Sequence, residues 1–174
     1  MKTLRELFKR LPTNGAVRDA LRKFNLAPKV NGKAKSVKEL AESLGFAVER
    51  RRLPAGMAGR LVQDPFSDNG YCIEVNEAHS VESQRWSVLH EMGHFFLHAT
   101  HNDPLADPLY LDRSGYAFYV DTRQEVEANE FAAVLLFGDG ALAAAMGLYG
   151  NNLKKLSKHF GVSEITIRIA MKQF

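Results

Sequence analysis

The spacing of apolar residues changes along the chain, and each change marks the expected start of a new element. A helical spacing runs from about Ala16 to Phe24, and a basic link that contains Gly and Pro follows it at residues 28–33. This pattern predicts an N-terminal helical extension over residues 1–35, which packs on or leads into the main body. Residues 36–174 are expected to form the main domain.

Strand chemistry follows a short helix at the start of this domain. Ser36 and Glu39 form a capping-box pattern, and the helix that they open is expected to stop near Gly45. Three extended runs separated by turn-forming residues come next, at 46–50, 57–62 and 71–76. They predict a small, mainly antiparallel sheet.

The second half of the chain has a predominantly helical pattern. One helix is expected from about Ser80 to His98, another from a cap at Thr122 to about Phe137, and two short ones at residues 152–160 and 163–172. The irregular stretch between the first two contains a candidate short strand at residues 116–120. The sequence therefore predicts an α+β fold in which a small sheet packs against helices.

Composition is that of an ordinary globular protein and excludes several other classes. The 174 residues are 45% hydrophobic and 25% charged. The net charge of +3 is compatible with nucleic-acid binding but is not evidence for it. The one cysteine, Cys72, excludes an internal disulfide framework, and its apolar neighbours predict a buried, inert thiol. No signal-peptide core or long apolar segment is evident, so we expect a cytoplasmic protein without membrane association.

His90, Glu91 and His94 form an HExxH motif within the expected Ser80–His98 helix. Residues four apart lie on the same face of a helix, so both imidazoles can bind one metal ion. Glu91 is offset by about 100° around the helix axis, which lets its carboxylate reach the activated water and not the metal. The motif predicts a zinc site with Glu91 as general base.

A catalytic zinc ion needs a third protein ligand, and several residues offer one. His98 is one turn beyond His94, but the stripe drifts by about 40° per step, so we expect it beside the site or in packing. Glu125 is the preferred ligand because helical spacing places it on the inward-facing stripe of its helix. The spacing selects none of the other candidates: His79, His101, Asp103, Asp107 and Asp112.

Asn129 and Glu127 lie near Glu125 in the expected helix at residues 122–137. Asn129, one turn after Glu125, is expected to hydrogen-bond a ligand and orient it. Glu127 is expected to face solvent. The alternative is a glutamate favoured by the helix dipole at Glu125 and an ordinary polar residue at Asn129.

The two helices together resemble the ImmA/IrrE metallopeptidases of bacteria, their phages and integrative elements. The similarity rests on WSVLHEMGHFFLH at residues 86–98 and EVEANEFA at residues 125–132, and in weaker form it covers about residues 36–174. The resemblance implies an α+β fold, Zn²⁺ bound by His90, His94 and Glu125, and Glu91 as base. It also implies a protein substrate, a helix-turn-helix repressor. The chain departs from the family pattern at Phe137-Gly138, outside the zinc-binding residues.

The expected reaction is hydrolysis of a peptide bond by zinc-activated water, with Glu91 carrying the proton to the leaving amine. A further donor is expected to stabilise the oxyanion. The sequence does not choose among the candidates, which are Tyr110, Tyr116, Tyr119, His98 and His101.

Two other classes of function remain open from the sequence. Residues 148–174 resemble a helix-turn-helix, which suggests a DNA-binding regulator, although Ile165, Ile167 and Ile169 make its second helix too apolar for a groove-facing surface. A catalytically silent zinc-binding module is the other alternative. We favour the peptidase, with a repressor encoded nearby as its partner, over direct DNA binding.

Overall fold

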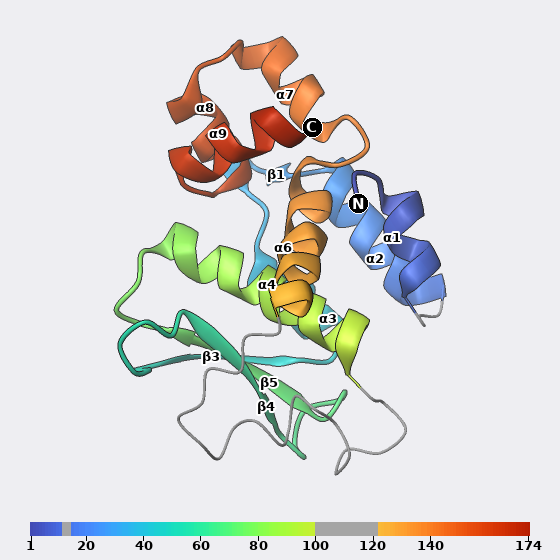
Figure 1. The fold of residues 1–174 in the computed structure, drawn as a ribbon, viewed down its shortest axis with the longest axis vertical. Coiled ribbons are helices and arrows are strands. Elements are labelled where there is room, and N and C mark those ends of the chain that lie inside the picture. The colour runs from blue at the N-terminus through green and yellow to red at the C-terminus, as the bar shows by residue number, and fades with distance from the viewer. Residues whose placement is uncertain (12–14, 100–121) are drawn as a thin grey trace.

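The computed structural model describes residues 1–11, 15–99 and 122–174, and it has the expected α+β fold (Figure 1). A small sheet forms one layer, helix α4 lies across it, and α6 packs on α4 (Figure 1). The candidate strand at residues 116–120 lies outside the described residues. So do several candidate side chains: His101, Asp103, Asp107, Tyr110, Asp112, Tyr116 and Tyr119.

Three strands, β3 (Ala47–Arg51), β4 (Gly59–Gln63) and β5 (Tyr71–Asn76), form the larger sheet in the order β3-β5-β4. β4 pairs antiparallel to β5, whereas β3 runs parallel to it. β5 is almost entirely buried because it is the central strand. Two of the three described strand pairings are antiparallel when the β1–β2 pair is included.

Helix α4 spans Val81–His98 and begins at Ser80, whose hydroxyl accepts a hydrogen bond from the Ser83 N–H. It packs on β4 and β5 with one face and on α6 (Thr122–Phe137) with another. The preceding helix, α3 (Val37–Ser43), is capped by Ser36 as the sequence predicted. Buried side chains from these elements form the core, among them Leu40, Leu61, Ile73, Leu89, Met92, Phe96, Phe131 and Leu135.

Helices α4 and α6 come very close together at Gly93, which lies inside the HExxH motif. A Cβ atom added to Gly93 would lie 2.9 Å from the Cα and 3.0 Å from the carbonyl oxygen of Ala128. Real Cβ atoms do not come this close to backbone, so only glycine permits this crossing. The absence of a side chain at Gly93 therefore sets the distance between the two helices.

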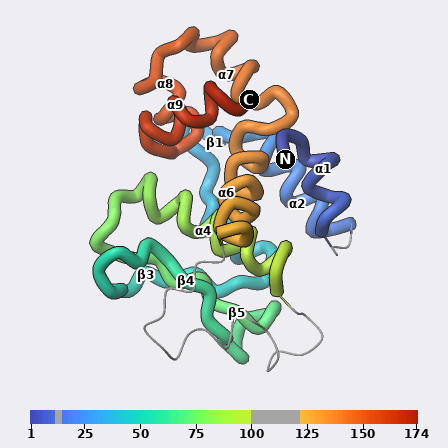
Figure 2. Tube along the Cα trace, in the orientation of Figure 1, coloured from blue at the N-terminus to red at the C-terminus, as the bar shows by residue number. Residues whose placement is uncertain are grey.

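The N-terminal segment contains two helices, α1 (Leu4–Arg10) and α2 (Gly15–Leu26), which flank α6 (Figure 2). The sequence predicted α2 but not α1. The signal for α1 was present, because Thr3 caps the helix at Glu6 and Leu4, Leu7 and Phe8 are buried at helical spacing. These side chains belong to the same hydrophobic cluster as the core of the main domain.

Buried Asn25 on α2 ties this segment to the end of α6. Its side-chain amide donates hydrogen bonds to the carbonyls of Val134, Leu135 and Gly138, at 3.3, 3.2 and 3.1 Å. Carbonyls in the last turn of a helix often lack a partner within the helix, and this amide adds a donor at the end of α6. The carbonyls of Val134 and Gly138 also accept from the backbone N–H groups of Gly138 and Ala141. The link after α2 forms the β1–β2 hairpin (Lys29–Val30 and Lys33–Ala34).

The hairpin was not predicted, although its turn has a recognisable sequence. Asn31 and Gly32 both have positive φ, 51° and 76°, as the two central residues of a type I′ turn require. Asn-Gly is the dipeptide that adopts this turn most readily. Each strand is only two residues long, too short for an alternating pattern to be detected.

The C-terminal part consists of α7 (Ala141–Tyr149), α8 (Leu153–Phe160) and α9 (Glu164–Gln173). The sequence predicted α8 and α9, which begin at the caps Asn152 and Ser163. It did not predict α7, which is rich in alanine and has no side-chain cap. Arg85 of α4 holds this part in place by donating hydrogen bonds to the carbonyls of Phe160 and Gly161, at 3.2 and 2.8 Å.

Two expectations from composition can be compared with the fold. Cys72 is buried in β5, and burial, together with the carboxylates of Glu49 and Glu74, raises the pKa of its thiol to about 11, as for an inert thiol. Within residues 1–11, 15–99 and 122–174, no single helix has the length and apolar character needed to cross a membrane. The bent pair α6 and α7 meets those criteria only when joined.

The crossing at Gly93 can be tested with Gly93→Ala. The added Cβ would force α4 and α6 apart, so we expect a loss of about 1–3 kcal/mol in the free energy of unfolding. Gly147→Ala is the control, because a Cβ at this helical position meets nothing within 4 Å, and alanine there should stabilise the protein by up to about 1 kcal/mol. Urea unfolding of both variants measures the difference; equal effects would show that the crossing tolerates a side chain.

Candidate metal centre

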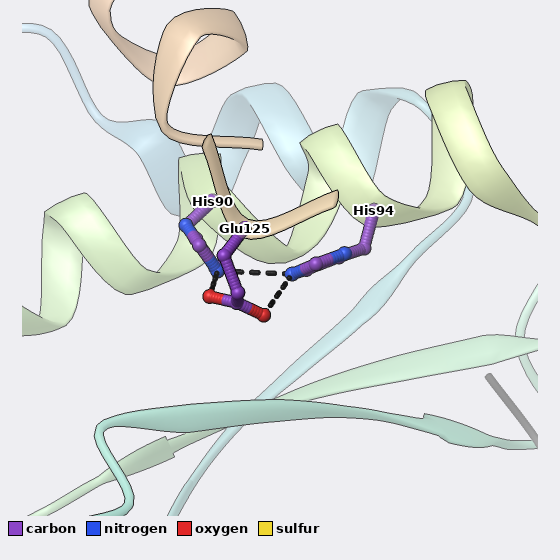
Figure 3. Close-up of side chains that lie close together, drawn as sticks. All are labelled: His90, His94 and Glu125. Carbon is purple, nitrogen blue, oxygen red and sulfur yellow. Dashed lines mark hydrogen bonds and ion pairs between the residues drawn. The ribbon is translucent and has the colours of Figure 1, made fainter. Parts of the chain in front are cut away.

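Three potential ligands from two helices meet in one place (Figure 3). His90 and His94 come from the middle of α4, and their Nε2 atoms lie 3.0 Å apart. Glu125 comes from the first turn of α6, and its two carboxylate oxygens lie 3.2 Å from His90 Nε2 and 3.1 Å from His94 Nε2. The structure therefore brings together the three residues that were predicted to bind zinc.

The outer nitrogen of His90 contacts Asn129, the residue predicted to orient a ligand. His90 Nδ1 lies 3.1 Å from Asn129 Oδ1, which also accepts a hydrogen bond from Trp86 Nε1 at 3.2 Å. Because this oxygen can only accept, the His90 Nδ1 must be the donor. With the ring neutral, the lone pair is then on Nε2, which faces Glu125 and His94.

The outer nitrogen of His94 contacts His98. The two Nδ1 atoms lie 3.2 Å apart, and His98 Nε2 lies 3.0 Å from Glu127 Oε2. His98 is thus beside the site, as the drift of the helical stripe predicted, and it is not among the three clustered ligands. His79, another candidate, contacts Ser83 and Gln84 at the start of α4 and takes no part in this cluster.

The expectation that Glu127 faces solvent was wrong. Its side chain is only 15% exposed, and it contacts His98 of α4 and Arg10 of α1, with Nη2–Oε1 at 2.8 Å. Spacing within α6 could not reveal these partners because they come from other helices. Burial opposes ionisation of Glu127, but hydrogen bonds from His98, Arg10 and Arg123 prevail and lower its pKa to about 2.

Electrostatics at the cluster favour a cation. Hydrogen bonds from His90 and His94 hold the pKa of Glu125 well below its usual range, so the carboxylate is ionised. Burial acts against protonation of His90, but the hydrogen bond to Glu125 and the charge of Glu91 prevail and raise its pKa. Two imidazole nitrogens and one carboxylate directed at the same point are the donor set of a divalent metal, and they fit zinc.

Glu91 lies on the side of α4 that packs on β4. It is buried, and a Cβ added to Gly59 of β4 would lie 3.6 Å from its Cγ and 3.1 Å from the Cβ of Ser87. Gly59 therefore lets the strand lie against the helix next to the expected base. Sequence analysis missed this residue, because the contact between β4 and α4 joins segments that no local pattern connects.

A groove of about 760 Å³ lies near the cluster, although none of the three clustered ligands lines it. Trp86 and Asn129, the residues behind His90, form part of its wall, and Val126 and Ile169 contribute apolar surface from α6 and α9. The groove therefore lies between the metal-binding helices and the C-terminal helix.

Comparison with protein-family models gives a match that covers most of the chain. Residues 41–172 match the Peptidase_M78 family model, described as the IrrE N-terminal-like domain. The match includes α4 and α6 with all three clustered ligands and leaves α1 and α2 outside. No curated protein sequence matches the chain at a significant level.

Asn129 can be tested as the residue that orients His90. Asn129→Ala removes the acceptor of both His90 and Trp86, and we expect zinc affinity to fall about 10–100-fold. Asn129→Asp keeps an acceptor oxygen and should stay close to the wild type. Competition with a chromophoric chelator measures both, and the fluorescence of Trp86, the single tryptophan, reports the local change. An alanine variant that binds like the wild type would contradict the role.

Metal binding should also depend on pH. The raised pKa of His90 means that a proton occupies this imidazole to a higher pH than usual and competes with the ion. Affinity should therefore fall as pH decreases through this pKa, approaching about tenfold per pH unit for one displaced proton. Titrations corrected for chelator protonation, with proton release measured by calorimetry in two buffers, test this. Equal affinity between about pH 5.5 and 8 would exclude such competition at His90.

Proposed function

The chain belongs to the IrrE N-terminal-like family of metallopeptidases, and on this premise we propose that it is a zinc-dependent endopeptidase. Its proposed substrate is a helix-turn-helix transcriptional repressor, cut at a specific peptide bond. The observation that carries the proposal is the convergence of His90, His94 and Glu125 on one point, with buried Glu91 next to the first ligand.

We assign zinc to this donor set. Two imidazoles and one carboxylate are a known catalytic set for zinc, in which a fourth position is left for water or substrate. Calcium and magnesium prefer sites built from oxygen atoms alone. The hydrogen bond from His90 to Asn129 supports this assignment because metal-binding histidines usually donate their other N–H to a fixed acceptor.

The residues of the chain have distinct roles in the proposed reaction. A zinc ion held here would supply Lewis acidity, which lowers the pKa of water toward 7 and polarises a peptide carbonyl. Glu91 would accept a proton from the attacking water and deliver it to the leaving amine. Asn129 would hold the orientation of His90 throughout.

The position of His98 removes it from the candidates for the oxyanion donor. Both of its ring nitrogens are already engaged, Nδ1 with His94 and Nε2 with Glu127. A donor must instead point at the reacting carbonyl. The remaining candidates, Tyr110, Tyr116, Tyr119 and His101, lie outside the described residues.

The repressor substrate is inferred from the resemblance of the two motif helices to the ImmA/IrrE peptidases. The surface of α9 supports a protein partner over DNA, because Ile165 and Ile169 are 70% and 51% exposed. Exposed apolar side chains suit a protein contact, whereas binding to DNA depends on cations that neutralise phosphates. Electrophoretic mobility shift at varied salt tests the alternative, and a sequence-specific shift would favour the regulator.

The proposed activity predicts that Glu91→Gln abolishes cleavage without loss of zinc. We expect the rate to fall by at least about 10²–10⁴-fold, because the variant lacks the general base. The candidate substrates to use are helix-turn-helix proteins encoded near this gene, with products identified by mass spectrometry. Glu82→Gln, at an exposed site on the same helix, is the matched control and should cleave normally.

Three outcomes separate the alternatives. Cleavage by the wild type and the Glu82 variant alone supports the peptidase. If zinc is bound but the wild type and the Glu91 variant are equally inert toward every neighbouring repressor, the chain is a silent zinc-binding module. If cleavage persists in the Glu91 variant, the base has been assigned to the wrong residue.

A further inference from the structure

A chain of polar contacts leads from the metal cluster to the N-terminal helix α1. His94 Nδ1 contacts His98 Nδ1 at 3.2 Å, and His98 Nε2 contacts Glu127 Oε2 at 3.0 Å. The other oxygen of Glu127 lies 2.8 Å from Arg10 Nη2. The contacts link three helices, because His94 and His98 are on α4, Glu127 is on α6 and Arg10 is on α1.

The chemistry of these groups fixes the direction of each hydrogen bond. The Glu127 carboxylate can only accept, so His98 Nε2 carries the hydrogen of that contact. In a neutral His98 the other nitrogen, Nδ1, is then an acceptor, and His94 Nδ1 must donate to it. The lone pair of His94 is consequently on Nε2, the atom that lies 3.1 Å from Glu125.

The position of Glu127 depends on two arginines that differ in exposure. Arg10 is 37% exposed, while Arg123, which lies one turn away on α6, is 84% exposed. An ion pair at the surface contributes little, since solvent screens it and the side chain is mobile. Arg10 therefore contributes more than Arg123 to fixing the position of the Glu127 carboxylate.

Packing fixes the place from which Arg10 reaches Glu127. Leu7 and Phe8 of α1 are buried in the core, and the Leu4 N–H donates to Asp139 Oδ2 at 2.9 Å, just beyond the end of α6. Helix α1 is thus held beside α6 (Figure 2). It also lies outside residues 41–172, the part of the chain that matches the family.

We propose that Glu127, held by Arg10, is a positioning residue that fixes the tautomer and orientation of His94 through His98. Helix α1 thereby becomes a part of the metal centre although it contributes none of the three clustered ligands. The inference rests on the metal site of the proposed function and adds a determinant of its affinity. If Glu127 only anchored α1, its loss would lower stability without altering the imidazole of His94.

The test compares two variants of Glu127 with a control. Glu127→Ala removes the acceptor of His98, so we expect zinc affinity to fall about tenfold, at the lower end for residues behind a ligand. Glu127→Gln keeps an acceptor oxygen and should restore most of that loss. Glu130→Ala, a carboxylate lost from the same helix and without a contact to His98, should bind zinc like the wild type.

A spectroscopic readout follows His94 itself. Nitrogen-15 spectra of the histidine side chains should show the Nδ1–H form of His94 in the wild type and in Glu127→Gln. In Glu127→Ala they should show a mixture of tautomers. Arg10→Gln should shift zinc affinity in the same direction by a smaller factor, whereas Lys9→Gln, an exposed neighbour on α1, should not.

The possible results separate the alternatives. The proposal is overturned if Glu127→Ala keeps wild-type affinity and a single His94 tautomer, even if its thermal unfolding midpoint falls. If that variant does not fold, the comparison of Arg10→Gln with Lys9→Gln decides by the same two readouts. If the wild type binds no zinc, the proposed function fails, while the His94 spectra still decide the positioning role.

Discussion

The contact between α4 and α6 at Gly93 is the constraint on which the metal centre depends. A glutamate side chain is short, so Glu125 can reach two imidazoles on another helix only if the two backbones lie very close. Gly93 permits this approach because it presents no side chain to Ala128. Gly93, the residue immediately before the second histidine of the motif, thus allows the third ligand to come within range of both imidazoles.

The same two helices also supply the hydrogen-bond partners of the imidazole Nδ1 atoms. Asn129 of α6 accepts from His90, and His98 of α4, itself held by Glu127 of α6, accepts from His94. Each histidine is therefore fixed at both nitrogens by groups on the α4–α6 interface. The two helices that pack Phe96 against Phe131 also carry the three ligands, so the packing of the core and the alignment of the ligands depend on the same interface.

Features that depend on neighbouring residues could be predicted from the sequence, whereas features that depend on distant residues could not. Helix α3, strand β5 and helix α4 were predicted closely because caps and apolar period are written in consecutive residues. Three features depend on contacts between distant segments and were not predicted: the parallel pairing of β3 with β5, Gly59 beside Glu91, and Arg10 beside Glu127. The three ligands were predicted from local patterns on two separate helices. The i,i+4 spacing predicted the two histidines, and the inward-facing stripe of the second helix predicted Glu125.

Arg85 connects the C-terminal helices to the helix that carries the HExxH motif. The Arg85 guanidinium donates hydrogen bonds to the carbonyls of Phe160 and Gly161. Arg85 lies on α4, only five residues before His90, the first histidine of the motif. Arg85 therefore ties the turn between α8 and α9 to the helix that carries both histidines. If a polypeptide bound to the exposed isoleucines of α9, this anchor would set the distance from that contact to the metal cluster, and with it the number of residues between the contact and the cut bond.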